Sequence, residues 1–184
     1  IDAALEYGFD PVKVNCVVVR RLNQDVLGMA NLSVDRPVHV RFIEYMPIGS
    51  DENRGFCAAD AGENPDGELR PEQWDASDTV PSSAAASAAG VGGLESVDNA
   101  LLPDGVGPAR YWRFPGAAGT VGFISAMSNH FCSSCNRMRL TADGSIRPCL
   151  FSDAEYRVRE ALRSGDDARV VEIFRDAVAH KPQE

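Results

Sequence analysis

The sequence predicts an α/β fold, and three consecutive stretches lead to this prediction. Residues 12–19 (VKVNCVVV) are a nearly continuous β-branched run, which is typical of a parallel strand buried on both faces. Residues 23–32 (NQDVLGMANL) have helical character with Asn23 as the expected N-cap, and residues 38–46 (VHVRFIEYM) form a second strand after Pro37. This order predicts a βαβ unit with parallel strands and a right-handed crossover.

The two ends of the sequence indicate part of a longer chain. Residues 1–10 (IDAALEYGFD) have the composition of the last turns of a helix, and Gly8 stands where a C-cap belongs. The first residue is Ile1, and the closing residues KPQE add no further element. We therefore expect a fragment or a separately made half of a larger protein.

Two side chains of the βαβ unit have both a structural and a functional interpretation. Lys13 is costly to bury without a partner, so it either reaches solvent at the strand end or binds an anion. Met46 ends the second strand at the edge where α/β folds bind ligands, although a methionine there is most often packing. Cys16 lies on the opposite face from Lys13, and we expect it in the core.

Residues 51–107 carry the weakest pattern. Cys57 is an isolated thiol in a polar stretch, and Trp74 would hold a short helix within PEQWDASDTV. The run PSSAAASAAGVGG predicts either a helix of low specificity or a flexible linker. We place the boundary of the βαβ part here, which gives three parts: residues 1–50, 51–107 and 108–184.

The last part combines short strands with two helices. Ser152 and Glu155 have the spacing of a capping box and indicate a helix start. The expected elements are strands over residues 109–116 and 120–125 and helices over residues 153–163 and 167–180. The last of these helices has apolar residues on one face, namely Val170, Val171, Phe174, Ala177 and Val178.

A β-hairpin is predicted between those strands and helices. The dipeptide Asp-Gly at 143–144 separates two strand-like runs, residues 137–141 and 145–150. This dipeptide is a strong signal for a two-residue hairpin turn. Such a turn places Met138 opposite Cys149 and folds that cysteine back along the chain.

Three of the five cysteines belong to this hairpin region. Cys132 and Cys135 form a C-x2-C pair, and Cys149 follows after thirteen residues. Arg137 and Arg139 alternate along the intervening strand and therefore share one side of it. Guanidinium groups match phosphate oxygens, so the pattern predicts three thiolates beside an anion-binding pair of arginines.

Three interpretations of these thiols remain open from spacing alone. They hold a closed zinc site with His130 as fourth ligand, or an iron–sulfur cluster with one iron left open, or they are buried thiols without metal. A C-x2-C pair closed by a third cysteine across a hairpin favours a metal. Arg147 on the return strand is a further candidate for phosphate contact.

The composition excludes several classes of protein. The formal net charge of −9 argues against nucleic-acid binding, which usually requires a basic surface. The sequence contains no apolar run of membrane-spanning length. Cysteines in metal spacing fit a reducing, cytoplasmic location better than a disulfide framework.

The hairpin region resembles a known family. The run GFISAMSNHFCSSCNRMRLTADGSIRPCLFSD is similar to the C-terminal cluster region of the MoaA family of radical S-adenosylmethionine enzymes, the GTP 3′,8-cyclases of molybdenum cofactor biosynthesis. The runs KVN and RFIEYMPIG resemble further segments of that family. The resemblance implies the C-terminal part of an incomplete (β/α) TIM-type barrel plus a small β-hairpin and helical iron–sulfur cluster region.

The resemblance also implies roles for particular residues. Cys132, Cys135 and Cys149 would hold a second [4Fe-4S] cluster whose open iron receives the purine of GTP. Met46 would lie against S-adenosylmethionine, and no residue of this chain would act as a catalytic acid or base. The residues implied for GTP binding are Lys13, Arg137, Met138 and Arg139.

The family resemblance implies cofactors and partners beyond this chain. A first [4Fe-4S] cluster and S-adenosylmethionine belong to a missing N-terminal half, because the 184 residues hold no C-x3-C-x2-C triplet. We therefore expect this chain alone to be inactive. The full-length protein would form a homodimer and supply cyclic pyranopterin monophosphate synthase. The alternative function is a non-catalytic interaction domain with a Cys3His zinc site that includes His130.

Overall fold

The computed structural model describes residues 1–47, 76–90, 93–97 and 107–182. Cys57 and the helix expected around Trp74 lie outside the described residues. The described residues form two compact units, one up to His130 and one from Phe131 onward. Within the described ranges, no helix combines the length and the apolar character needed to cross a bilayer.

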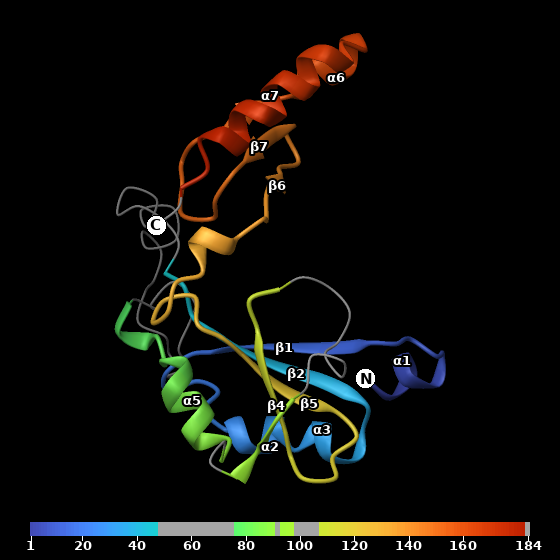
Figure 1. The fold of residues 1–184 in the computed structure, drawn as a ribbon, viewed down its shortest axis with the longest axis vertical. Helices are drawn as coiled ribbons and strands as arrows, with labels where there is room; N and C mark the ends of the chain where they lie inside the picture. The colour runs from blue at the N-terminus through green and yellow to red at the C-terminus, as the bar shows by residue number, and fades with distance from the viewer. Residues whose placement is uncertain (48–75, 91–92, 98–106, 183–184) are drawn as a thin grey trace, which may run out of the picture. The chain divides into compact units, whose positions relative to one another are not determined.

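The first unit contains a five-stranded mixed sheet (Figure 1). Its strand order is β1, β2, β5, β4, β3, in which β1, β2 and β5 are mutually parallel and β4 and β3 are antiparallel to their neighbours. The strand bounds are β1 (Val12–Val18), β2 (Val38–Glu44), β3 (Glu95–Ser96), β4 (Arg110–Arg113) and β5 (Thr120–Ile124). The prediction of an α/β fold with parallel first strands is confirmed.

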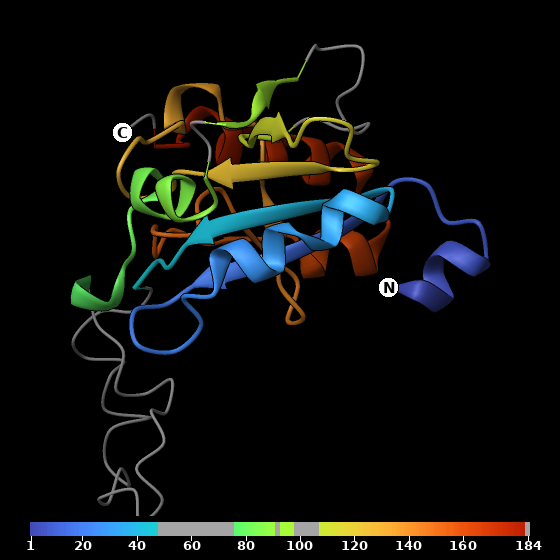
Figure 2. The same cartoon turned by 90° about the horizontal axis from the view of Figure 1, so that it is seen from below.

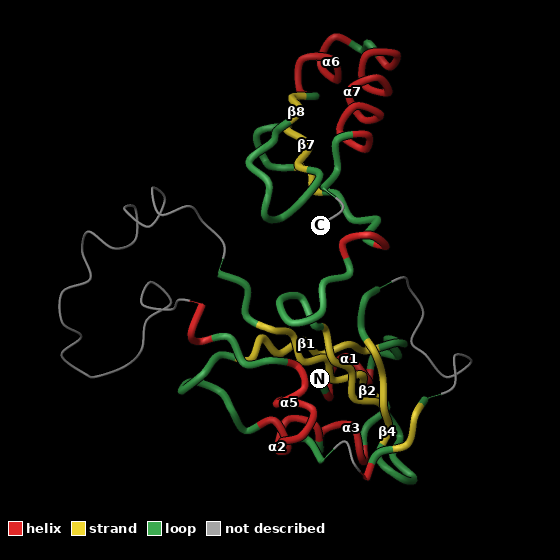
Figure 3. Tube along the Cα trace, turned by 60° about the vertical axis from the view of Figure 1, so that its left-hand side comes forward, coloured by secondary structure: helices red, strands yellow, loops and turns green. Residues whose placement is uncertain are grey.

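The short helices α2 (Val26–Ala30), α3 (Leu32–Asp35) and α5 (Ser82–Ala88) cover one face of this sheet. The first unit also contains α1 (Asp2–Glu6) before β1 and the 3-10 turn η2 (Ala76–Asp78) before α5. Figures 2 and 3 show α2, α3 and α5 beside the same strands. Val26 and Ala85 from these helices pack against Val40, Phe42 and Val121 of the sheet. The small-residue run therefore forms a helix here, because alanine lets its backbone approach the strands closely.

Two details of the first unit differ from the prediction. Asp25 caps α2 by accepting a hydrogen bond from the Gly28 N–H at 3.0 Å. Asn23 instead bonds the strand end, accepting from the Val19 N–H at 2.8 Å and donating to the Val17 carbonyl at 2.7 Å. The prediction that β1 is buried on both faces is also wrong, because Val17 is 43% exposed on the face opposite the helices.

β4 and β5 join the sheet of β1 and β2, so the first unit extends through residues that the sequence analysis grouped with the cysteines. The Trp112 and Phe123 rings lie edge to face at 5.4 Å, and Phe123 stacks on Phe42 at 5.5 Å. These aromatic side chains are therefore core packing. The assignment of residues 1–50, 51–107 and 108–184 to separate functional parts stays a prediction.

The second unit is a three-stranded antiparallel sheet covered by helices. Its elements are the 3-10 turn η5 (Cys132–Ser134), β6 (Arg139–Leu140), β7 (Ser145–Arg147), β8 (Tyr156–Arg157), α6 (Arg159–Ser164) and α7 (Asp167–Ala179). Ile146 of β7, Val158 and Ala177 of α7 form its buried core, and Figure 3 shows α7 alongside β7 and β8. Gly165, with a φ of 72°, is the C-cap of α6.

The prediction of a helix over residues 153–163 is wrong for the first half of that range. Tyr156 and Arg157 are β8 and pair with β7, and the helix begins only at Arg159. Ser152 accepts a hydrogen bond from the Ala154 N–H at 3.2 Å but caps no helix. Long-range strand pairing therefore overrides the local capping signal.

The helix predicted over residues 167–180 is present as α7, but its apolar residues do not share one environment. Ala177 is buried and Val170 packs against the core, whereas Phe174 is 49% exposed. Val171 and Val178 are exposed as well.

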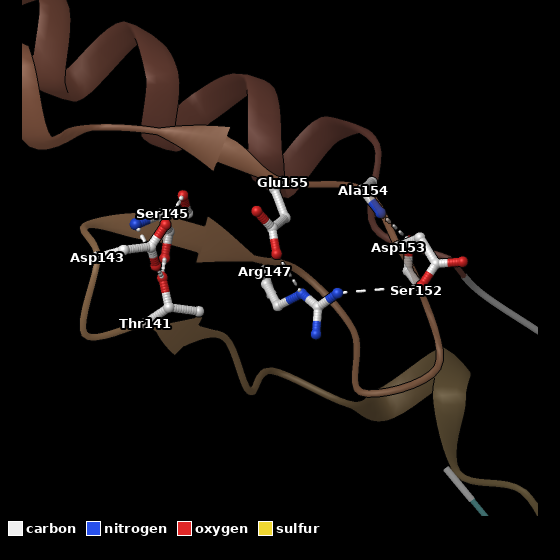
Figure 4. Close-up of polar contacts among 8 residues, drawn as sticks. All are labelled: Thr141, Asp143, Ser145, Arg147, Ser152, Asp153, Ala154 and Glu155. Carbon is white, nitrogen blue, oxygen red and sulfur yellow. Dashed lines mark hydrogen bonds and ion pairs between the residues drawn. The ribbon is translucent and has the colours of Figure 1, made fainter. Parts of the chain in front are cut away.

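The hairpin register also differs by one residue from the prediction. Leu140 pairs with Ile146, and the Thr141 N–H donates to the Ser145 carbonyl at 2.9 Å, so the loop holds three residues instead of two. Gly144 has a φ of 86°, as expected for a three-residue loop that ends in a left-handed residue. Thr141 donates to the Asp143 carboxylate and accepts from the Ser145 N–H at 2.9 Å, which favours the longer loop (Figure 4).

Candidate functional site

The three cysteines of the C-x2-C…C pattern lie in the second unit and are half-buried free thiols. Cys132 begins the turn η5, and Cys135 closes it by donating its N–H to the Cys132 carbonyl at 3.1 Å. Cys149 follows β7 directly after Pro148. The three residues are therefore neither fully exposed nor part of the buried core.

Cys135 has an electropositive environment. Burial by itself raises the pKa of the Cys135 thiol, but hydrogen bonds from the backbone and side chain of Arg137 and the charges of Lys181 and Arg137 outweigh it, so its pKa is lowered. By contrast, burial raises the pKa of Cys16 in the sheet of the first unit. The thiolate is the form that binds metal, so the lowered pKa makes Cys135 a better metal ligand than Cys16.

The donor set fits an iron–sulfur cluster in kind, because three free thiols lie on the two arms of one hairpin. Among the described residues, no three His, Cys, Asp or Glu side chains lie close enough together to hold a metal ion. The choice between the iron–sulfur cluster and the zinc site with His130 therefore stays a prediction.

The two arginines of the hairpin are placed differently. The Arg137 guanidinium lies over the Phe131 ring at 5.0 Å, and its carbonyl accepts a hydrogen bond from the Lys181 ammonium at 2.7 Å. Arg139 is exposed on β6. The Met138 side chain between them packs against the core of the second unit. A role of these three residues in GTP binding stays a prediction.

Arg147 is engaged by acidic partners. Its Nε lies 3.0 Å from a Glu155 oxygen, and its Nη2 lies 3.9 Å from Asp153 (Figure 4). An arginine whose charge is offset by two carboxylates is a weak phosphate ligand. The structure therefore gives no support to the suggestion that Arg147 contacts phosphate.

In the first unit, the sheet face opposite the helices carries polar and basic side chains. Lys13 lies beside His39 in the β1–β2 register, and Asn15 lies beside Arg41. The Arg41 Nε donates to the Asn15 Oδ1 at 2.8 Å. Burial lowers the pKa of His39, and the positive charges of Lys13 and Arg41 lower it further. The negative charge of Asp10 acts in the opposite direction, but the net result is a lowered pKa of His39.

The end of β2 is fixed by a buried carboxylate. Glu44 is 2% exposed and accepts hydrogen bonds from the N–H groups of Ser82 at 2.6 Å, Met127 at 2.6 Å and Ser128 at 2.8 Å. Burial raises the pKa of Glu44, but these bonds and the Ser128 hydroxyl outweigh it, so its pKa is lowered. Met46, two residues further along, is half-buried.

Comparison with known proteins identifies the family. The family model described as Molybdenum Cofactor Synthesis C matches residues 72–184, the region that holds the cysteine hairpin. The chain belongs to this family. The resemblance expected from the hairpin motif is therefore confirmed.

Curated relatives of the Molybdenum Cofactor Synthesis C chain carry one name. The GTP 3′,8-cyclase of Pelotomaculum thermopropionicum is 42% identical over 184 residues, which cover 99% of this chain and 50% of that protein. The GTP 3′,8-cyclases of Heliobacterium modesticaldum and Moorella thermoacetica are 42% and 41% identical, again over 50% of their length. The chain spans about half the length of the curated relatives it matches.

Sequence reasoning missed three side chains that organise this family member. Arg41 shares a face with Lys13 because strand pairing places them together, and the period-2 alternation of both strands carried that signal. Glu44 and Lys181 bond partners far away in the sequence, so no local pattern reveals them.

Proposed function

We propose that this chain is the GTP-binding and [4Fe-4S]-binding part of a GTP 3′,8-cyclase. That enzyme would convert GTP to (8S)-3′,8-cyclo-7,8-dihydroguanosine 5′-triphosphate in molybdopterin biosynthesis, by the radical chemistry of S-adenosylmethionine. The observation that carries the proposal is the hairpin with three free thiols beside Arg137, in a chain whose relatives named GTP 3′,8-cyclase match it end to end.

Cys132, Cys135 and Cys149 would hold the cluster. When bound with three protein ligands, the cluster supplies one open iron position for the purine of the substrate. The lowered pKa of Cys135 supports this role, because ligation requires the thiolate. The positive charges of Arg137 and Lys181 would offset the negative charge that the thiolates bring.

Arg137 and Arg139 would bind the phosphates of GTP from the second unit, and the backbone at Met138 would complete that segment. Guanidinium groups bind phosphate oxygens in pairs and keep their charge at any physiological pH. The contact of Arg137 with the Phe131 ring orients its guanidinium before any ligand arrives. Holding the substrate in one orientation is the contribution of these residues, and none of them acts as a general base.

In the first unit we propose that β1 and β2 belong to an incomplete (β/α) barrel. Their parallel pairing supports this, and Met46 follows the carboxyl end of β2, which is the end where barrel enzymes bind ligands. Lys13 would bind GTP phosphate, and Met46 would contact S-adenosylmethionine.

The remaining partners belong to the whole protein. A first [4Fe-4S] cluster and the rest of the S-adenosylmethionine site would lie outside these 184 residues, so we expect this chain alone not to catalyse the reaction. We further propose that the whole protein is a cytoplasmic homodimer and that cyclic pyranopterin monophosphate synthase consumes its product.

The test is anaerobic reconstitution of this chain with iron and sulfide. We expect about four irons per chain and an electron paramagnetic resonance spectrum that changes with GTP but not with CTP. The variants C132S, C135S and C149S should each lose the cluster. C16S is the matched control, since Cys16 is a half-buried thiol of the sheet in the first unit, and it should retain the full iron content.

One zinc per chain, no cluster and no response to GTP would overturn this proposal. Loss of zinc in a His130→Ala variant would then support the alternative interaction domain. His130→Ala should leave the iron content unchanged if the cluster proposal is right.

A further inference from the structure

The two arms of the cysteine hairpin are paired by a very short ladder. β6 and β7 pair only at Arg139 with Arg147 and at Leu140 with Ile146. Pro148 follows and has no N–H to donate, so it cannot extend the ladder toward Cys149. Strand pairing therefore ends before it reaches the cysteines on either arm.

The ammonium group of Lys181 connects the two arms beyond that point. Its Nζ donates to the Arg137 carbonyl at 2.7 Å and to the Pro148 carbonyl at 2.5 Å. Arg137 is two residues after Cys135, and Pro148 directly precedes Cys149. A lysine ammonium has three donors and no acceptor, and charged donors make the stronger hydrogen bonds. Lys181 thus provides two charged hydrogen bonds between the arms where the strands themselves form none.

Lys181 reaches this place from a helix end that is itself fixed. Ala177 is fully buried in α7 against the core, and the Lys181 N–H donates to the Val178 carbonyl at 3.2 Å. The His180 ring stacks on Tyr156 of β8 with centroids 6.2 Å apart. The packing of α7 on the same sheet therefore places the ammonium group at the end of the hairpin that lies away from its loop, where strand pairing has stopped.

We infer that Lys181 is a positioning residue of the cysteine site, which ties the chain segment that carries Cys135 to the segment that carries Cys149. This inference rests on the proposed function, because it assigns the cluster to these cysteines. Lys181 would act through the two backbone carbonyls that it bonds. Outer residues of this kind set metal affinity by orienting the ligands.

The test compares Lys181→Met with Lys181→Arg and with Arg175→Gln in the reconstituted chain. Lys181→Met keeps the length of the side chain but removes the charge and all three donors. Arg175→Gln removes one positive charge from the exposed surface of α7 and is the matched control. We expect Lys181→Met to lose iron to a chelator about tenfold faster than the unchanged chain, Lys181→Arg to be intermediate, and Arg175→Gln to be unchanged.

A metal-free measurement separates this inference from the proposed function. Amide hydrogen exchange without iron should be faster in Lys181→Met over residues 135–139 and 149–150, and unchanged over β1 and β2. If the unchanged chain binds no cluster, the proposed function fails, and the exchange experiment alone decides whether Lys181 ties the arms. Equal exchange in Lys181→Met and the unchanged chain, or equal iron loss, would overturn the inference.

Discussion

The carboxylate of Glu44 bonds both the backbone N–H and the hydroxyl of Ser128, a residue 84 positions later in the chain. The same carboxylate accepts from the Ser82 N–H at the start of α5. One buried side chain thus joins the end of β2 to the segment that follows β5. These bonds hold Met127 and Ser128 to the end of β2 within the first unit.

We predict that Glu44→Gln destabilises the first unit by about 2 kcal/mol, since hydrogen bonds to a charged group are worth more than neutral ones and an amide NH2 would face N–H donors. The measurement is the free energy of unfolding from urea denaturation. Glu95→Gln, at an exposed position of β3, is the control and should change that free energy by less than about 0.5 kcal/mol. Equal effects of both variants would show that the bonds of Glu44 contribute nothing specific.

The pH dependence of stability should also report on Glu44. Its pKa is lowered in the folded chain from an ordinary value of 4.5, so the unfolded chain binds the proton more tightly. The stabilisation is therefore complete above the ordinary pKa and is lost as the pH falls through the lowered one. We expect the difference in unfolding free energy between the unchanged chain and Glu44→Gln to shrink as the pH falls below 4.5. A difference that stays constant over that range would contradict this assignment.

The parallel pair β1–β2 was predictable, because β-branched runs and a helical segment between them are local patterns. The same alternation placed Lys13 on the face opposite Val18, as found. The exposure of Val17 was not predictable, because it depends on which elements cover that face. Local periodicity reports a strand but not its neighbours.

The second unit shows the limits of local signals more plainly. The capping-box spacing of Ser152 and Glu155 predicted a helix, but Glu155 lies against Arg147 and the following Tyr156 pairs with Ile146. Lys181 bonds carbonyls 44 and 33 residues earlier, which no window of sequence contains. The cysteine motif could be recognised in the sequence because metal binding requires cysteine at particular spacings. The contacts of Lys181 could not, because they depend on which residues the fold brings together.

The three-residue hairpin loop should depend on glycine at position 144. Its φ is 86°, and a Cβ there would lie 2.6 Å from the Arg159 Cβ. We predict that Gly144→Ala destabilises the second unit by about 3 kcal/mol, from backbone strain and the contact together. Gly165→Ala is the matched control, because its φ is 72° and nothing lies within 4 Å of its added Cβ. In Gly165→Ala only the backbone strain applies, so we expect a loss of stability of about 1 to 2 kcal/mol. Thermal unfolding should therefore show a lower midpoint for Gly144→Ala than for Gly165→Ala.

The two arginines that face each other in the β6–β7 pair should contribute differently to GTP binding. Arg139 and Arg147 lie directly opposite each other, but Glu155 and Asp153 offset only the charge of Arg147. We therefore expect Arg139→Gln to weaken GTP binding to the reconstituted chain about tenfold or more, since one charged hydrogen bond is worth about 1.5 to 3 kcal/mol and each ~1.4 kcal/mol is a factor of ten. Arg147→Gln should change the affinity less than about twofold, because it removes an arginine already paired with acids. Isothermal titration with GTP measures both. An Arg147→Gln variant that loses as much affinity as Arg139→Gln would mean that Glu155 releases Arg147 to the phosphates when the nucleotide binds.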